Sequence, residues 1–169
     1  MFTKSCWDMY RIGLGFDIHK TSEKRELFIG GIKIPSKFGL LGHSDADVGI
    51  HAICDSIFGA LSMKDIGYYF SNNSSKWRNK NSVHFLKFAR DNLVKNNYYI
   101  VNLDINFICE QPNINKHRSK MIKNLSSILK VPEKIISIKA TSNEKIGFIG
   151  DGLGIAAESI VQISNEKTY

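Results

Sequence analysis

The chain has 169 residues, of which 43% are hydrophobic and 23% charged, as in folded globular proteins and unlike disordered chains. This length predicts one domain with a sizeable core. No apolar run approaches the roughly 20 residues that a membrane-spanning helix needs, so we expect no membrane partner. The first nine residues, MFTKSCWDM, are too short and too mixed in character for a secretory signal.

The formal net charge of +7 favours anionic partners such as phosphate esters, nucleic acids or acidic membranes. A lysine-rich solvated surface explains the same charge without any partner. The basic residues between 115 and 145 are spread out and are not interleaved with aromatic residues as in single-strand-binding proteins, so we expect no nucleic acid partner. Cys6, Cys54 and Cys109 form no C-x-x-C pair, which favours a reducing compartment over a disulfide framework.

Strand-like and helix-like segments alternate along the chain. We expect strands at residues 10–19, 26–34 (in two short pieces), 98–109, 135–141 and 154–164, and helices at 48–61, 83–96 and 115–130. Ser44 or Asp45 is the expected N-cap of the first helix. Residues 71–82 predict a polar loop and residues 142–154 a turn-rich segment. This order favours an α/β or α+β fold in layers, of which we expect the α+β form, a layered mixed β-sheet with helices on one face.

The first strand holds Asp17 and His19 two positions apart, so their side chains point to the same face. We expect Ile18, between them, to point into the core. A carboxylate and an imidazole are two of the usual zinc ligands. Alone, this pair is weak evidence for a metal, because it often occurs by chance and an Asp–His hydrogen bond at the surface explains it.

A second cluster of titratable residues, GHSDADVGIHAICD, occupies the first predicted helix and the loop before it. Asp47, His51 and Asp55 recur at every fourth residue and share one helix face. His51 is the candidate third metal ligand, with Asp55 or Asp47 orienting its other ring nitrogen. The alternative is a half-buried histidine paired to Asp55. Three protein ligands with an open fourth position would form a catalytic type of zinc site.

Two further segments favour phosphate chemistry. His43 and Ser44 stand at a loop-to-helix junction, where backbone amides and the helix dipole favour anions. Thr141, Ser142 and Glu144 directly follow a predicted strand, where hydroxyl groups can bind phosphate or a nucleobase and Glu144 would suit a hard cation such as Mg²⁺. A solvated turn is the alternative for this second segment.

Five motifs occur in the order RIGLGFDIH, IGGIKIP, GLLGHSDADVGIHAICDSIFGA, DIG and KATSNEKIGFIG. Together they resemble the 2-C-methyl-D-erythritol 2,4-cyclodiphosphate synthase family, from about Arg11 to Ile163. The resemblance implies a single domain over residues 11–165 after an extension of residues 1–10. It also implies a homotrimer around a β-rich threefold core, with active sites between neighbouring subunits.

The resemblance further implies a cyclising lyase of the non-mevalonate isoprenoid pathway. Members convert 4-diphosphocytidyl-2-C-methyl-D-erythritol 2-phosphate into the 2,4-cyclodiphosphate and CMP, using one Zn²⁺ and one Mg²⁺ or Mn²⁺ per site. The family's cavity on the threefold axis implies an isoprenoid phosphate as a further partner. The family's distribution, with the Lys, Asn and Ile bias of this chain, implies a plastid (apicoplast-like) stroma, with the targeting peptide absent from this chain, or a bacterial cytoplasm.

Carried over residue by residue, the resemblance implies zinc ligation by Asp17, His19 and His51. It implies stabilisation of the transition state by His43 and Ser142 and places Glu144 near the second metal. The residues implied to contact the substrate are Asp17, His19, His43, Ser44, Asp65, Ile66, Gly67, Phe70, Ser74, Cys109, Pro112, Asn113, Ile114, Asn115, Ala140, Thr141, Ser142, Glu144 and Phe148.

Three positions depart from the family pattern. The loop FSNNS at residues 70–74 lacks the two acidic residues of the usual F-P-D-T-D. Asn113 stands where a lysine is usual, and Asp151 where an arginine is common. Losing two cations and gaining an acid is expected to weaken diphosphate binding unless Lys116 or Lys145 substitutes.

Two other functions fit the same residues. A different metal-dependent phosphohydrolase with this D-x-H…H site would release inorganic phosphate or an open phosphate product instead of CMP and a cyclic diphosphate. A non-catalytic trimeric binding module for isoprenoid phosphates would keep its ligand when His51 is replaced by alanine.

Overall fold

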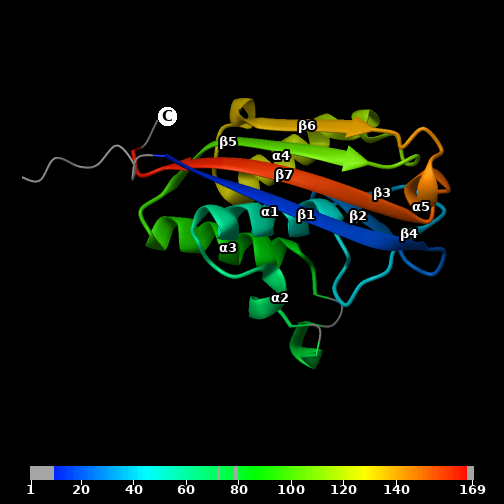
Figure 1. Cartoon of the computed structure of the whole chain (residues 1–169), viewed down its shortest axis with the longest axis horizontal. Helices are drawn as coiled ribbons and strands as arrows, with labels where there is room; N and C mark the ends of the chain where they lie inside the picture. The colour runs from blue at the N-terminus through cyan, green and yellow to red at the C-terminus, as the bar shows by residue number, and fades with distance from the viewer. Residues whose placement is uncertain (1–9, 72, 78–79, 167–169) are drawn as a thin grey trace, which may run out of the picture.

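The computed structural model describes residues 10–71, 73–77 and 80–166 (Figure 1). Its main sheet has five strands in the order β4-β1-β7-β5-β6. The strands are β1 (Tyr10–Ser22), β4 (Gly39–Leu40), β5 (Tyr99–Ile108), β6 (Ile136–Thr141) and β7 (Gly154–Ser164). β5 and β6 run parallel and the other neighbours run antiparallel, so the sheet is mixed, as expected.

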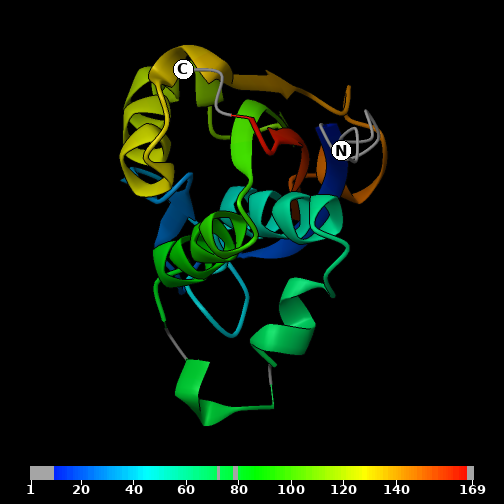
Figure 2. The same ribbon diagram turned by 90° about the vertical axis from the view of Figure 1, so that its left-hand side faces the viewer.

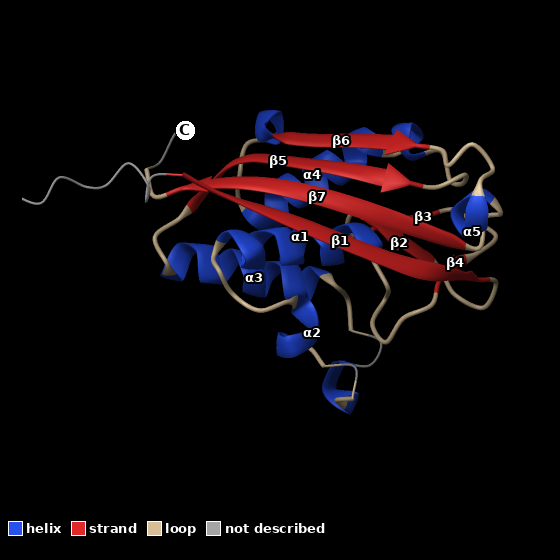
Figure 3. Cartoon of the chain, viewed as in Figure 1, coloured by secondary structure: helices blue, strands red, loops and turns tan. Residues whose placement is uncertain are grey.

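Three long helices lie on one side of this sheet (Figures 1 and 2). α1 (Val48–Ala60) and α4 (Arg118–Leu129) cover its face, and α3 (Val83–Lys95) packs against α1. The short hairpin of β2 (Leu27–Ile29) and β3 (Ile32–Ile34) and the short helices α2 (Ile66–Tyr69) and α5 (Gly147–Gly150) complete the arrangement (Figure 3). The predicted α+β class is therefore confirmed. None of the helices in the described ranges has the length and apolar character needed to cross a membrane.

The predicted elements differ from the observed ones mainly at their starts. α4 begins three residues later than expected because Ile114–Lys116 form a 3₁₀ turn, in which the side chain of Asn113 accepts a hydrogen bond from the Lys116 amide. A second 3₁₀ turn, Glu133–Ile135, precedes β6, and a third, Ser75–Trp77, lies in the predicted polar loop. Most of the predicted N-terminal extension, and residues 72, 78 and 79 of that loop, lie outside the described residues.

The apolar side chains of β1 point away from the core, contrary to the expectation for Ile18. Ile18, expected in the core, lies on the outer face of the sheet and is 36% exposed. The inner face instead presents Gly13 and Gly15 to α1. A Cβ atom at Gly13 would lie 1.8 Å from the Ser56 carbonyl oxygen, and one at Gly15 1.9 Å from that of Ala52. The backbone of α1 thus occupies the space that side chains at Gly13 and Gly15 would fill, so α1 packs directly on this face of β1.

The N-cap of α1 is Asp47, so the predicted capping by Ser44 or Asp45 is wrong. The Asp47 carboxylate accepts a hydrogen bond from the Ile50 amide and two more from the amides of Gly30 and Gly31. Burial raises the pKa of Asp47, although these amide donors oppose the rise. The three bonds tie the start of α1 to the turn between β2 and β3.

Gly15→Ala is expected to lower the urea midpoint of unfolding, because the added methyl group must displace the backbone of α1. Overpacked sites typically lose about 1–3 kcal/mol of stability. The matched control is Gly59→Ala in α1, where the nearest atom to a new Cβ lies 3.7 Å away. It should leave the midpoint unchanged or raise it. Equal midpoints for Gly15→Ala and the wild type, at one protein concentration, would contradict this packing.

Candidate metal centre

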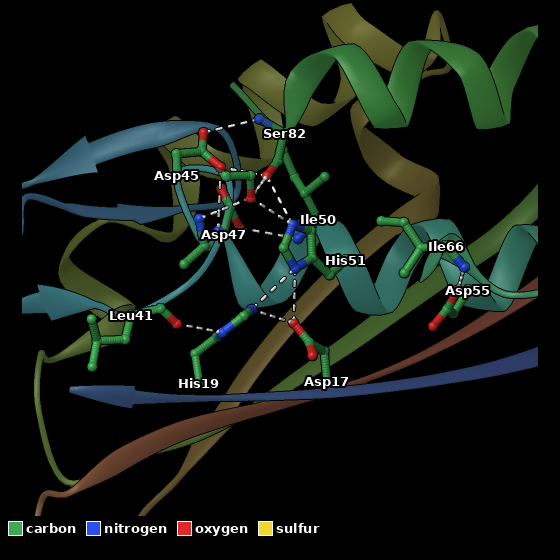
Figure 4. A network of polar contacts seen from close by, with 12 residues as sticks. Asp17, His19, Leu41, Asp45, Asp47, Ile50, His51, Asp55, Ile66 and Ser82 are labelled. Atoms are coloured by element: carbon green, nitrogen blue, oxygen red, sulfur yellow. Dashed lines mark hydrogen bonds and ion pairs between the residues drawn. The ribbon is translucent and has the colours of Figure 1, made fainter. Parts of the chain in front are cut away.

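Three ligand atoms converge between β1 and α1 (Figure 4). Asp17 Oδ2 lies 2.9 Å from His19 Nε2 and 3.0 Å from His51 Nδ1, and the two nitrogens are 3.1 Å apart. β1 supplies two of the side chains and α1 the third. One carboxylate oxygen and two imidazole nitrogens facing a common point form a donor set that suits Zn²⁺. The predicted metal triad is therefore assembled within one chain.

The other ring nitrogen of each histidine is also held. His19 Nδ1 lies 2.7 Å from the Leu41 carbonyl oxygen, which can only accept a hydrogen bond. His19 Nδ1 therefore carries a proton, which leaves Nε2 as the ring atom available to a metal. His51 Nε2 lies 2.9 Å from Ser82 Oγ and 3.3 Å from Ser44 Oγ.

The predicted carboxylate partners of His51 are wrong. Asp47 is used as the cap of α1, and Asp55 Oδ1 accepts a hydrogen bond of 2.7 Å from the Ile66 amide at the start of α2. Helical spacing placed both acids beside His51, but backbone amides closer to their oxygens bind them. Burial, together with the charges of Asp65 and Asp17, raises the pKa of Asp55.

The electrostatics of the triad keep Asp17 ionised. Burial alone would raise the pKa of Asp17, but hydrogen bonds and charge from His19 and His51 outweigh burial and hold this pKa well below its usual range. Burial alone would lower the pKa of His19, but the hydrogen bond and charge of Asp17 raise it above its ordinary value. Asp17 is therefore ionised at neutral pH, as a metal ligand must be.

A cavity of about 330 Å³ opens beside the triad. Phe70 packs at its wall, with its ring centroid 4.4 Å from that of Phe85 and 4.9 Å from that of Trp77. Besides the triad, the lining residues are Gly42, His43, Ser44, Ile66, Gly67, Phe70, Trp77 and Phe85. Five of these were predicted as substrate residues from the sequence: His43, Ser44, Ile66, Gly67 and Phe70. The structure therefore brings most of the predicted substrate residues between His43 and Ser74 together around the triad.

Two members of that group have other positions. Asp65 caps α2, where its Oδ1 accepts a hydrogen bond of 2.9 Å from the Tyr68 amide, and it does not line the cavity. Ser74 contributes its carbonyl oxygen, which lies 3.1 Å from His43 Nε2. This contact joins the loop after α2 to the candidate catalytic histidine.

The predicted substrate residues from Cys109 onward lie at the opposite edge of the sheet. β5 and β6 run parallel, so the segments that follow them, residues 109–115 and 142–144, start side by side, and the Cys109 amide donates to the Thr141 carbonyl oxygen at 3.1 Å. Cys109 and Ile114 are buried, and burial raises the pKa of the Cys109 thiol to about 11. None of these segments is among the residues that line the metal cavity.

The 142–146 turn is held in an unusual backbone conformation. Glu144 and Lys145 have φ angles of 51° and 59°, in the left-handed region. Glu110 Oε1 accepts a hydrogen bond from the Asn143 amide at 2.9 Å, and Ser142 Oγ donates to Glu144 Oε1 at 2.5 Å. The two predicted functional side chains of this turn are thus paired with each other. Asn113, Asn115, Ala140, Thr141 and Phe148 are exposed, and Pro112 is half-buried.

Three residues of the site were missed from the sequence. Phe85 is indistinguishable from the other core residues of an amphipathic helix, and Ser82 reads as an ordinary residue before that helix. Trp77 offered a signal, because it is an aromatic residue within an Asn- and Ser-rich loop.

A second cavity, of about 520 Å³, lies between the ends of α3 and α4 and the start of β5. None of the residues that line it was predicted for the site from the sequence.

A mixed sheet with its helices on one side and an Asp-His-His set between strand and helix defines an α+β protein with a candidate site for a divalent metal ion. Residues 10–164 match the model of the YgbB family. A relative from Clostridium novyi (strain NT), named 2-C-methyl-D-erythritol 2,4-cyclodiphosphate synthase, is 47% identical over 157 residues, which cover 93% of this chain and 99% of the relative. The chain belongs to the YgbB family of 2-C-methyl-D-erythritol 2,4-cyclodiphosphate synthases, which confirms the resemblance of its motifs.

Solved structures agree with this family. IspF of Plasmodium falciparum, solved as a CDP complex, superimposes with a TM-score of 0.84 at 39% identity, covering 95% of this chain and 99% of that one. The bifunctional IspDF from Campylobacter jejuni gives a TM-score of 0.88 at 35% identity, and the match covers 92% of this chain but 42% of the bifunctional one. The present chain therefore corresponds to one part of the bifunctional protein.

Asp17→Asn is expected to reduce zinc affinity more than about tenfold, because a charged ligand oxygen of the triad is lost. Asp55→Asn is the matched control, since Asp55 binds the Ile66 amide and not the ligand atoms. Chelator competition and elemental analysis of both purified variants measure the effect. Full zinc occupancy in Asp17→Asn, or equal loss in both variants, would contradict this ligand set.

Proposed function

We propose that this chain is a cyclising lyase that converts 4-diphosphocytidyl-2-C-methyl-D-erythritol 2-phosphate into 2-C-methyl-D-erythritol 2,4-cyclodiphosphate and CMP. Its family and the name of its Clostridium relative support this reaction, and the CDP complex of the Plasmodium falciparum protein supports a cytidine nucleotide as ligand. The observation that carries most weight is the convergence of Asp17, His19 and His51 beside a cavity lined by His43 and Ser44.

In the proposed reaction, an oxygen of the 2-phosphate forms a bond to the β-phosphorus of the diphosphate. The bond from that phosphorus to the bridging oxygen breaks, and CMP leaves with that oxygen. A protein nucleophile is not required, because both reacting groups belong to the substrate. The main task of the protein is then to hold the two ends of a flexible molecule together, which is catalysis by proximity.

The residues of the cavity suit this task. A zinc ion held by Asp17, His19 and His51 would neutralise phosphate charge and polarise a phosphoryl oxygen. His43 lines the cavity with its Nε2 donating to the Ser74 carbonyl oxygen, and the imidazolium form of His43 would offer a phosphate a second N–H from Nδ1. Glu144, exposed and paired with Ser142, is the candidate for holding Mg²⁺ or Mn²⁺ near the diphosphate.

We also propose that neighbouring subunits of a homotrimer complete each site. The metal triad on β1 and the predicted substrate residues that follow β5 and β6 lie toward opposite edges of one sheet, so they do not meet within a single chain. The outer face of β1 exposes an apolar row that includes Ile12 at 69% and Leu14 at 65%. Contiguous apolar surface of this kind is typical of a protein interface. A second copy that covers this row would place the ends of its β5 and β6 beside the metal triad of the first copy.

Purified protein with Zn²⁺ and Mg²⁺ is expected to release CMP and a cyclic diphosphate from the cytidyl substrate. Removing the metals with a chelator should suppress the release. His51→Ala should lower kcat/KM by at least about a hundredfold, because several kcal/mol of charge stabilisation is lost. Product analysis by mass spectrometry distinguishes the outcomes. Release of inorganic phosphate would instead indicate a phosphohydrolase, and no CMP at any metal concentration would contradict the proposal.

Mixed trimers test the shared site. His51→Ala and Ser142→Ala homotrimers should each be strongly impaired, since one lacks the metal group and the other lacks a candidate catalytic hydroxyl. Unfolding and refolding the two variants together at a 1:1 ratio should restore activity at about one quarter of the sites, because each site then draws on two subunits. No recovery, with trimers verified by light scattering, would contradict sites formed between subunits.

A further inference from the structure

We propose that Ser82 and Asp45 are positioning residues that fix the tautomer and orientation of His51, so that its Nδ1 lone pair faces the metal. This inference rests on the metal site of the proposed function and extends that site by a second layer of side chains. Figure 4 shows Asp45 and Ser82 on the side of the His51 ring opposite Asp17.

The Ser82 hydroxyl contacts His51 and does not cap α3. It occupies the N-cap position of α3, where a serine normally accepts a hydrogen bond from an amide two or three residues later. Its side chain makes no such bond. The side chain is completely buried, and its Oγ instead lies 2.9 Å from His51 Nε2 and donates to Asp45 Oδ1. A local preference broken at a buried position beside a metal triad indicates a functional role.

The direction of each hydrogen bond follows from the donors available. An ionised carboxylate can only accept, and Asp45 accepts from both the Ser82 amide, at 3.0 Å, and the Ser82 hydroxyl. The single hydroxyl proton of Ser82 is thus used on Asp45, so Ser82 Oγ offers His51 only lone pairs. His51 Nε2 must therefore be the donor. A neutral imidazole with its proton on Nε2 has its lone pair on Nδ1, on the side of the ring that faces Asp17 Oδ2 and His19 Nε2, where a cation would bind.

The two histidines of the triad are oriented by different means. His19 is held by the Leu41 backbone carbonyl, which no side-chain substitution removes. His51 depends on side chains, with Ser44 Oγ as a second and longer contact at 3.3 Å. The Asp45 amide also donates to the Lys80 carbonyl at 3.1 Å, which joins the loop before α1 to the segment before α3. The orientation of His51 is therefore open to a direct mutational test.

Zinc affinity, measured by chelator competition, is the first readout. Ser82→Ala and Asp45→Asn should each bind zinc about 10–100-fold more weakly, the range typical of partners that orient a ligand. The double variant should be no weaker than the weaker single variant, because the two residues act as one chain. Ser82→Thr, which keeps the hydroxyl, should restore affinity. Ser56→Ala is the matched control, a fully buried serine of α1 that bonds to Ile53 and Ser159.

The tautomer of His51 is the second readout and needs no variant to fold. Long-range ¹H–¹⁵N correlation spectra of the zinc-loaded wild-type protein should show His51 protonated on Nε2, and a mixture of tautomers in zinc-loaded Ser82→Ala. Protonation on Nδ1 in the zinc-loaded wild type would overturn the proposal. Equal zinc affinity in the wild type and a folded Ser82→Ala would overturn it as well, while leaving the metal site intact. A wild type that binds no zinc would overturn both the site and its positioning residues.

Discussion

The contact between β1 and the backbone of α1 holds the candidate metal centre together. Gly13 and Gly15 have no side chains on the inner face of β1, so the helix lies directly on the strand. Two residues further along that face the strand presents Asp17, and the helix presents His51 within 3.0 Å of it. His19 follows on the same face of the strand. A wider separation of strand and helix would disperse the three ligands, so packing and metal binding depend on the same two glycines.

This packing also determines what the other side of β1 does. Because the inner face is used by glycine and by the polar triad, the apolar side chains of the strand, such as Leu14 and Phe16, lie on the outer face and remain exposed in a single chain. One strand thus offers ligands on one face and a candidate subunit interface on the other. The predicted substrate residues at the ends of β5 and β6 lie at the far edge of the same sheet, where the proposed trimer would bring them to the candidate metal centre of a neighbour.

Periodicity predicted the elements well, and two-residue spacing placed Asp17 and His19 on one face because that is local geometry. His51 was a candidate third ligand by its residue type and by the family resemblance, since the contact of α1 with β1 is not local. It failed where the partner is distant in sequence. Ile18 seemed a core residue because it is apolar, yet the glycines beside it decide which face α1 covers. Asp47 caps α1 because the amides of the β2–β3 turn add to the cap, and the sequence has no sign of that turn's approach. Ser82 was missed because its partners His51 and Asp45 lie on other segments, which only the folded chain brings beside it.

The most direct test of this metal centre is anomalous diffraction at the zinc edge from crystals of the zinc-loaded protein. We expect one peak between β1 and α1, with Asp17 Oδ2, His19 Nε2 and His51 Nδ1 each at about 2.0–2.2 Å. A peak elsewhere on the chain, or zinc bound by His51 through Nε2, would contradict the proposed centre.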